Sequence, residues 1–185
     1  MAATILEKRY TKQDVLDLPD AVQYELVDGI PTERPVSWET SAIAVEVSSV
    51  LRNFVRPLRL GVIAGSDNTL DIFPNRPDHF RRADVSFTRQ ERVPGGRPDK
   101  GDQEVPPDLV VEVVSPNERA YTLEEKVQEY LDAGVRLIWV IYPNLRCVDV
   151  IRPGRPKARL LSTDSLDGED ILPGFSHPVA SLFDI

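Results

Sequence analysis

A glutamate lies in the middle of an otherwise apolar segment, and it is the first residue of this sequence that suggests chemistry. Residues 108–115 read Asp-Leu-Val-Val-Glu-Val-Val-Ser, with Glu112 among the valines. Apolar side chains alternate to both faces of such a strand, so we expect both faces to be covered. An unpartnered carboxylate would be costly there, which favours a metal ion, a lysine or a hydrogen-bond network as its partner. A place at a sheet edge or in a structural ion pair would also satisfy Glu112.

Asp84 is the second candidate carboxylate. It lies in Arg-Ala-Asp-Val-Ser-Phe, residues 82–87, where strand alternation puts it on the face opposite Ala83 and Val85. The same pattern suits a solvent-facing aspartate beside basic residues. If its strand lies near that of Glu112, the two carboxylates supply the hard oxygen ligands that Mg²⁺ prefers.

Lys126 is the third candidate. At about 100° per residue it lies about 60° from Leu123, on the margin of the apolar stripe of a predicted helix and next to Tyr130. Because this helix follows the Glu112 strand directly, its ammonium group could turn toward Glu112, or it could extend along the helix surface to water. Two carboxylates and a lysine suit metal-assisted phosphodiester hydrolysis, in which the lysine orients the attacking water or stabilises the developing negative charge.

Glu25 is a further candidate, since it points opposite to Tyr24 and Leu26 in a predicted hairpin strand. It could be an additional metal ligand or a residue that supports the site. An exposed strand glutamate fits the pattern equally well.

Other chemistries find little support in the sequence. His79 and His177 are isolated, without His-x-x-x-His spacing, so we expect surface histidines and no zinc site. Neither a Gly-x-Ser-x-Gly nor a Gly-x-x-x-x-Gly-Lys motif occurs, which leaves serine hydrolases and P-loop enzymes unsupported. The single cysteine, Cys147, is expected to be a small core residue.

The predicted elements alternate between strands and helices. Capping patterns and apolar periodicity predict helices over 12–18, 40–56 and 123–133, the second ending at Pro57 and the third capped by Thr122 with Glu125. Strands are predicted over 24–27, 30–34, 61–66, 68–73, 83–87, 108–115, 135–142, 147–151 and 158–162, with a long loop over 89–107. A right-handed crossover over 109–142 would give a mixed sheet with helices on its faces, an α/β fold, or α+β by a stricter definition.

The length and net charge of the chain limit its domain organisation and the partners that it can bind. A chain of 185 residues suits one domain spanning 1–185. A net charge of −8 argues against indiscriminate binding to a polyanion. Seven basic residues against four acidic ones in 76–100 could nevertheless meet phosphate, or form solvated loop charge. We find no secretory signal and no apolar run near the ~20 residues that span a bilayer, so we expect a cytoplasmic protein without membrane contact.

Taken together, these motifs resemble the Uma-two family of restriction-endonuclease-like proteins within the PD-(D/E)XK nuclease superfamily. The resemblance covers nearly the whole chain. It runs through residues 24–29, 82–87, 107–116, Lys126 with Tyr130, Gly134-Val135, 138–143, Gly174-Phe175 and Leu182-Phe183.

The resemblance implies a restriction-endonuclease-like core: a mixed central sheet flanked by helices, preceded by an N-terminal helix and a β-hairpin. It also implies Mg²⁺, or Mn²⁺, held by Asp84, Glu112 and the carbonyl of Val113. The superfamily's lysine two residues after the glutamate is Val114 here, and its role passes to Lys126.

Two positions depart from the family pattern. Ala83 replaces the usual proline before the aspartate, which changes backbone stiffness but leaves the carboxylate. Near Thr40, many members carry a histidine before the long helix, and this chain has none there. The second departure casts doubt on any role of that histidine.

We therefore expect a Mg²⁺-dependent DNA endonuclease in which Asp84 and Glu112 bind the metal, Lys126 assists the attacking water and Glu25 supports the site. DNA is the expected partner, and the resemblance together with the loop over 89–107 favours a homodimer. The alternative is a catalytically inactive nuclease-fold protein that binds nucleic acid or a protein partner, in line with the charge of −8 and the missing histidine. As a third reading, Lys126 and the carboxylates form a buried ion pair that only stabilises the core.

Overall fold

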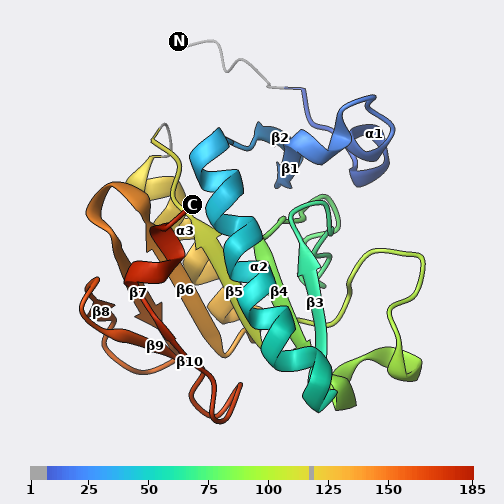
Figure 1. The fold of residues 1–185 in the computed structure, drawn as a ribbon. Helices are drawn as coiled ribbons and strands as arrows, with labels where there is room; N and C mark the ends of the chain where they lie inside the picture. Colours follow the sequence, from blue (N-terminus) through green and yellow to red (C-terminus); the bar gives the residue numbers. More distant parts are fainter. Residues whose placement is uncertain (1–7, 117–118) are drawn as a thin grey trace.

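The computed structural model of the protein describes residues 8–116 and 119–185 (Figure 1). The α-helices in these ranges are α1 (Lys12–Leu16), α2 (Trp38–Leu58) and α3 (Ala120–Asp132). The strands are β1 (Tyr24–Val27), β2 (Ile30–Glu33), β3 (Gly61–Gly65), β4 (Val85–Arg89), β5 (Leu109–Val113), β6 (Leu137–Tyr142), β7 (Cys147–Ile151), β8 (Ala158–Leu160), β9 (Ser165–Asp167) and β10 (Ser176–Pro178). No helix in these ranges has both the length and the apolar character needed to cross a bilayer.

A six-stranded mixed sheet in the order β3-β4-β5-β6-β7-β8 forms the centre, as predicted. Its β5 and β6 are parallel, and the other neighbouring pairs are antiparallel. Helix α3 makes the crossover between β5 and β6. In Figure 1, α2 lies across one face of the sheet and α3 lies behind the other.

Strand β5 is buried on both faces. Val111 packs in the cluster that contains the α2 stripe, and Val110 packs in the cluster that contains the α3 stripe. Glu112 alternates with Val111, so its side chain belongs to the α3 face. The sequence prediction of a central, doubly covered strand is confirmed.

Helix α2 is longer than predicted. Ser37 caps it through a reciprocal capping box with Thr40, so it begins at Trp38. Its last turn includes Pro57, and it ends where Arg59 adopts a left-handed conformation. Ile43, Val47, Leu51 and Val55 recur every four residues and form the buried stripe.

Helix α3 begins earlier than predicted. It starts at Ala120 after Arg119, whose side chain makes no capping hydrogen bond, so Thr122 and Glu125 lie inside the helix and the predicted capping box is wrong. The buried face includes Lys126 together with Leu123, Val127 and Tyr130. Lys126 therefore points into the protein instead of lying on the margin of the stripe.

The N-terminal hairpin is confirmed, and its attachment places Glu25. The backbone N–H and C=O of Leu26 in β1 pair with Phe80 at 3.2 and 2.9 Å. Val15 of α1, Leu26 and Phe80 form a small separate core. This pairing brings β1 beside residues 80–82, which lead into β4 of the central sheet.

Other boundaries differ from the expectation. Residues 68–73 form no strand, because Leu70 makes only isolated bridges to Arg81 and Gln103. Strand β4 begins at Val85, so Asp84 immediately precedes it. The β9–β10 hairpin was missed, since three-residue strands carry almost no periodic signal.

Strand β3 offers a test of this packing, because its two terminal glycines differ in the space around them. A Cβ on Gly61 would lie 2.1 Å from the carbonyl oxygen of Thr88, whereas one on Gly65 would meet only Asp67, at 3.8 Å. We expect Gly61→Ala to lower the free energy of unfolding by about 2 kcal/mol or more. Gly65→Ala, the matched control, should change it by about 0.5 kcal/mol at most. Urea denaturation measures both, and equal midpoints would contradict the β3–β4 packing.

Candidate active site

The predicted site residues surround one cavity of about 570 Å³. Its lining includes Glu25, Asp84, Glu112, Val113 and Lys126, contributed by β1, the residue before β4, the end of β5 and α3. The first half of α2, residues 32–36 and residues 65–67 also line it. The structure thus brings together residues that are far apart in the chain, while their catalytic roles stay predictions.

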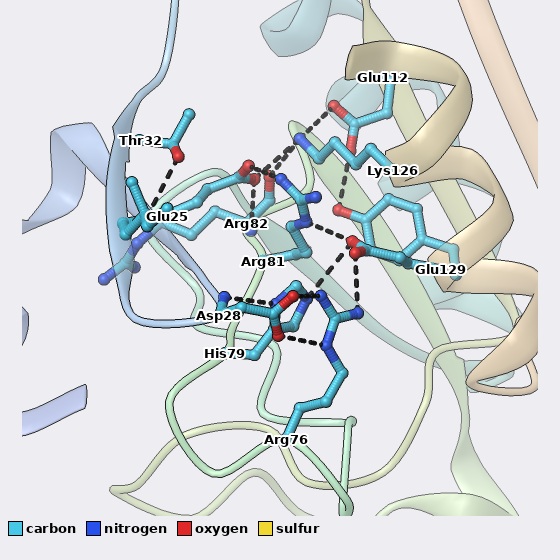
Figure 2. Close-up of polar contacts among 12 residues, drawn as sticks. Glu25, Asp28, Thr32, Arg76, His79, Arg81, Arg82, Glu112, Lys126 and Glu129 are labelled. Carbon is cyan, nitrogen blue, oxygen red and sulfur yellow. Dashed lines mark hydrogen bonds and ion pairs between the residues drawn. The ribbon is translucent and has the colours of Figure 1, made fainter. Parts of the chain in front are cut away.

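Lys126 lies between two carboxylates (Figure 2). Its Nζ is 2.9 Å from Oε2 of Glu112 and 2.9 Å from Oε1 of Glu25, and it donates to the carbonyl of Arg82 at 3.1 Å. Three acceptors match the three donors of an ammonium group. Burial alone would lower the pKa of Lys126, but the charges of Glu112 and Glu25 outweigh it and raise that pKa, so the amine stays protonated. The alternative of a lysine extended to water is wrong.

Glu112 is buried and accepts from two donors. Lys126 bonds its Oε2, and the hydroxyl of Tyr130 donates to its Oε1 at 2.9 Å. Burial raises the pKa of Glu112 to about 8, and the charges of Asp84 and Glu25 contribute to the rise while Lys126 opposes it. Burial is the largest of these causes, so the interior disfavours the ionised form of this carboxyl group.

Tyr130 is a site residue that the sequence did not reveal. A tyrosine four residues after Lys126 looks like part of the helix's apolar stripe, and its ring does pack in the core. Its hydroxyl is nevertheless aimed at Glu112. Burial and the charge of Glu112 raise the pKa of Tyr130 well above its ordinary value, so it remains a proton donor in this bond.

Asp84 is half-buried and fixed at the end of β5. Its Oδ2 accepts the backbone N–H of Val113 at 2.8 Å, and its Oδ1 accepts from Arg34 at 3.0 Å. Asp84 thus lies at the cavity beside the basic Arg34, with part of its side chain still exposed to solvent. Arg34 follows β2 and had no spacing that linked it to Asp84, so only the folded hairpin shows this contact.

Glu25 is also buried, with 4% of its surface exposed. Its Oε1 accepts the backbone N–H of Arg82 at 2.8 Å, and its Oε2 lies 3.0 Å from NH1 of Arg81. Burial would raise the pKa of Glu25, but Lys126 and Arg81 lower it to about 2. Glu25 is thus an ionised partner of Lys126, and the alternative of an exposed strand glutamate is wrong.

Two expectations about the surrounding charges are wrong. Arg81 and Arg82 were counted in a solvated or phosphate-binding lobe, yet both are buried because their segment turns inward beside β1. His79 was expected on the surface, but it is fully buried against the ring of Phe73 and accepts the backbone N–H of Asp28 at its Nδ1. His177 is half-buried.

The donor set fits a hard divalent cation better than zinc. Within residues 8–116 and 119–185, no group of three or more His, Cys, Asp or Glu side chains could hold a metal. Mg²⁺, however, is commonly held by one or two carboxylates together with water and substrate phosphate. Each carboxylate offers about four acceptor sites, so the contacts of Asp84 and Glu112 leave capacity for a cation.

The comparison with known families is decisive for classification. The Uma2 family model, described as "Putative restriction endonuclease", matches residues 12–180. This chain belongs to the Uma2 family. The resemblance seen in the sequence motifs is thereby confirmed over nearly the whole chain.

This Uma2 protein also shares its fold with a protein of solved structure. That structure is the crystal structure of a "putative nuclease belonging to DUF820" from Anabaena variabilis, with a TM-score of 0.78 and 22% sequence identity. The match covers 94% of this chain and 97% of that one. Similarity at this identity establishes the fold. No curated protein matches the sequence.

The buried ion pair can be tested through stability. Lys126→Met should lower the free energy of unfolding by about 3–5 kcal/mol, because it leaves Glu112 buried without its cationic partner. Adding Glu112→Gln should recover part of this loss, giving a coupling of about 1 kcal/mol or more between the two positions. Chemical denaturation of the parent, both single variants and the double variant measures the coupling. Strictly additive effects would show that the two side chains do not depend on each other.

Proposed function

We propose that this protein is a divalent-metal-dependent endonuclease that hydrolyses phosphodiester bonds in DNA. The observation that carries the proposal is the shared cavity of Asp84, Glu112 and Lys126, with the lysine amine 2.9 Å from the glutamate carboxylate. The description of the Uma2 family supports the reaction class. Asp84, Glu112 and the carbonyl of Val113 would hold Mg²⁺ or Mn²⁺.

A bound divalent cation would lower the pKa of a coordinated water and screen the charge of the phosphate. The protein's own groups prepare the site for this chemistry. Arg34 and the N–H of Val113 fix the carboxylate of Asp84 at the end of β5. Tyr130 and Lys126 fix that of Glu112.

Lys126 acts as a cation in this proposal. Its raised pKa rules against its taking a proton from water at neutral pH, so it orients the water and stabilises negative charge developing on the phosphate. Glu25 keeps the amine protonated and directed toward Glu112. Both effects depend on exclusion of bulk water from the buried side of the cavity.

The surroundings of the cavity set conditions on the substrate. With a net charge of −8 the chain as a whole repels a polyanion, so we expect contact with DNA to be confined to the cavity and its rim. Val36 and Val45 line the cavity and are 65% and 67% exposed, and Trp38 between them in the sequence is 92% exposed.

A homodimer stays a prediction, which sedimentation equilibrium tests directly.

A second candidate function is favoured by the contacts of the carboxylates. All four oxygens of Asp84 and Glu112 already accept from groups of the protein. A nuclease fold that binds nucleic acid or a protein partner without cutting would need no more than this. Metal binding separates the two functions.

Cleavage of supercoiled plasmid DNA in the presence of Mg²⁺ or Mn²⁺ tests the proposed reaction. We expect the parent protein to nick the plasmid and a chelator to stop it. Glu112→Ala, Asp84→Asn and Lys126→Ala should each reduce the rate by about a hundredfold or more, because the first two remove a proposed metal ligand and the third removes the cation that stabilises charge on the phosphate.

Matched controls come from the exposed loop after β4. Glu91→Gln and Lys100→Ala change the same residue types outside the cavity and should leave the rate unchanged. Equal cleavage by the parent and all site variants would exclude this cavity as the source of activity.

The affinity for Mg²⁺ should depend on pH. The pKa of Glu112 is raised to about 8. Below that pH a metal ion must therefore displace the proton of the Glu112 carboxyl group before it can bind. Affinity should therefore rise by up to about tenfold per unit between about pH 6 and pH 8 and level off above it, with proton release on binding. Calorimetric titration in buffers of different ionisation enthalpy measures this, and Asp84→Asn should abolish binding. Absence of binding even with DNA present would favour the non-cleaving alternative.

A further inference from the structure

A chain of alternating charges leads away from the cavity (Figure 2). Behind Lys126 and Glu25, the guanidinium of Arg81 lies 3.0 Å from Oε2 of Glu25 and 2.7 Å from Oε2 of Glu129. Arg81 is 2% exposed, and neither it nor Glu129 lines the cavity. These two residues therefore have no direct access to a substrate.

Arg81 controls the orientation of Glu25. A carboxylate is planar, so a bond that fixes one oxygen also fixes the direction of the other. Arg81 holds Oε2, and Oε1 is thereby directed at the amine of Lys126, 2.9 Å away, and at the N–H of Arg82. The charged fork of an arginine is well suited to this fixed geometry.

Arg81 also holds helix α3. Glu129 is three residues after Lys126, so both side chains lie on one side of the helix. The bond from Nε of Arg81 to Glu129 fixes the rotation of α3 relative to β1. Arg81 thus binds both the helix that carries Lys126, through Glu129, and the strand that carries Glu25, the partner of Lys126.

The residues farthest from the cavity in this series of alternating charges are also held in place. Arg76 donates to Glu129 at 2.8 Å and grips both oxygens of Asp28, in the turn of the hairpin, at 2.7 and 2.8 Å. His79 lies with Nε2 3.3 Å from Oε2 of Glu129. Burial would raise the pKa of Glu129, but its contacts with His79, Arg81 and Arg76 hold that pKa well below its ordinary value, so Glu129 stays ionised as a partner for Arg81.

We infer that Arg81 and Glu129 are positioning residues of the active site, acting through Glu25 and through α3 to hold the amine of Lys126 against Glu112. The effect on catalysis rests on the proposed function, whereas the effect on the lysine does not. Without Arg81, Glu25 keeps Lys126 as its remaining side-chain ion-pair partner and draws the amine away from Glu112. A merely structural ion pair would lower stability and leave the amine in place.

The ammonium group of Lys126 can be observed directly. The chain has five lysines, so ¹⁵N-lysine labelling gives few Nζ signals, and the signal lost in Lys126→Met identifies the one of interest. A buried ammonium with three acceptors should exchange its protons slowly with water.

The test compares Arg81→Gln and Glu129→Gln with the parent. In both variants we expect the Nζ signal of Lys126 to shift and its proton exchange to accelerate by about tenfold or more. The kcat for DNA cleavage should fall by about tenfold to a hundredfold with KM changed by no more than about twofold, since the substrate does not touch either residue. Glu129 is the less buried of the two, so Glu129→Gln keeps the test available if Arg81→Gln does not fold.

Arg152→Gln is the matched control. It removes another ion-paired arginine, bound to Glu169 away from the cavity, and should leave the Lys126 signal and kcat unchanged. An unaltered Lys126 signal in both test variants, whatever their stability, would overturn the inference. A Lys126 signal that responds in a protein without nuclease activity would support the positioning role and refute the proposed function.

Discussion

The site depends on one interaction, a buried ammonium held between two buried carboxylates. Lys126 has 6% of its surface exposed and Glu25 and Glu112 have 4% each. Taking charged groups out of water costs several kcal/mol per ion, and their mutual attraction offsets that cost only when the geometry is good and the remaining donors are satisfied. Such an arrangement is weak evidence for stability, because apolar residues of similar volume often serve a core as well. Its place at the wall of a cavity, with Asp84 beside it, favours a chemical role.

The fold supplies the geometry through two constraints. The parallel pairing of β5 and β6 requires a crossover, and α3 is that crossover, so Lys126 returns over the strand that carries Glu112. The antiparallel pairing of Leu26 with Phe80 attaches the hairpin to the segment before β4, and this attachment brings Glu25 into contact with Lys126. The central sheet thus positions one half of the site, and the hairpin positions the other.

The features that could be predicted from the sequence are those in which the local pattern agrees with the final environment. The valines around Glu112 indicated a doubly covered strand, helical spacing brought Lys126 near the apolar stripe, and Asp28-Gly29 indicated the hairpin turn that the positive φ values of both residues confirm. In each case the residues next to one another in the sequence are enough to predict which side chains are buried.

The remaining features depend on contacts between distant segments. Arg34 meets Asp84 across 50 positions, and Arg81 meets Glu129 across 48, so no spacing rule relates them. His79 was misplaced because an isolated histidine is usually exposed, whereas here Phe73 and the hairpin turn cover it. Tyr130 was read as a core residue, which describes its ring but not its hydroxyl.

Anomalous scattering from Mn²⁺ in a crystal of the protein tests the central claim most directly. The account predicts a peak between Asp84 and Glu112 within about 2.0–2.6 Å of a carboxylate oxygen from each, with the amine of Lys126 still in contact with Glu112. A crystal saturated with Mn²⁺ that shows no peak between these carboxylates, with Lys126 turned away from both, would contradict it.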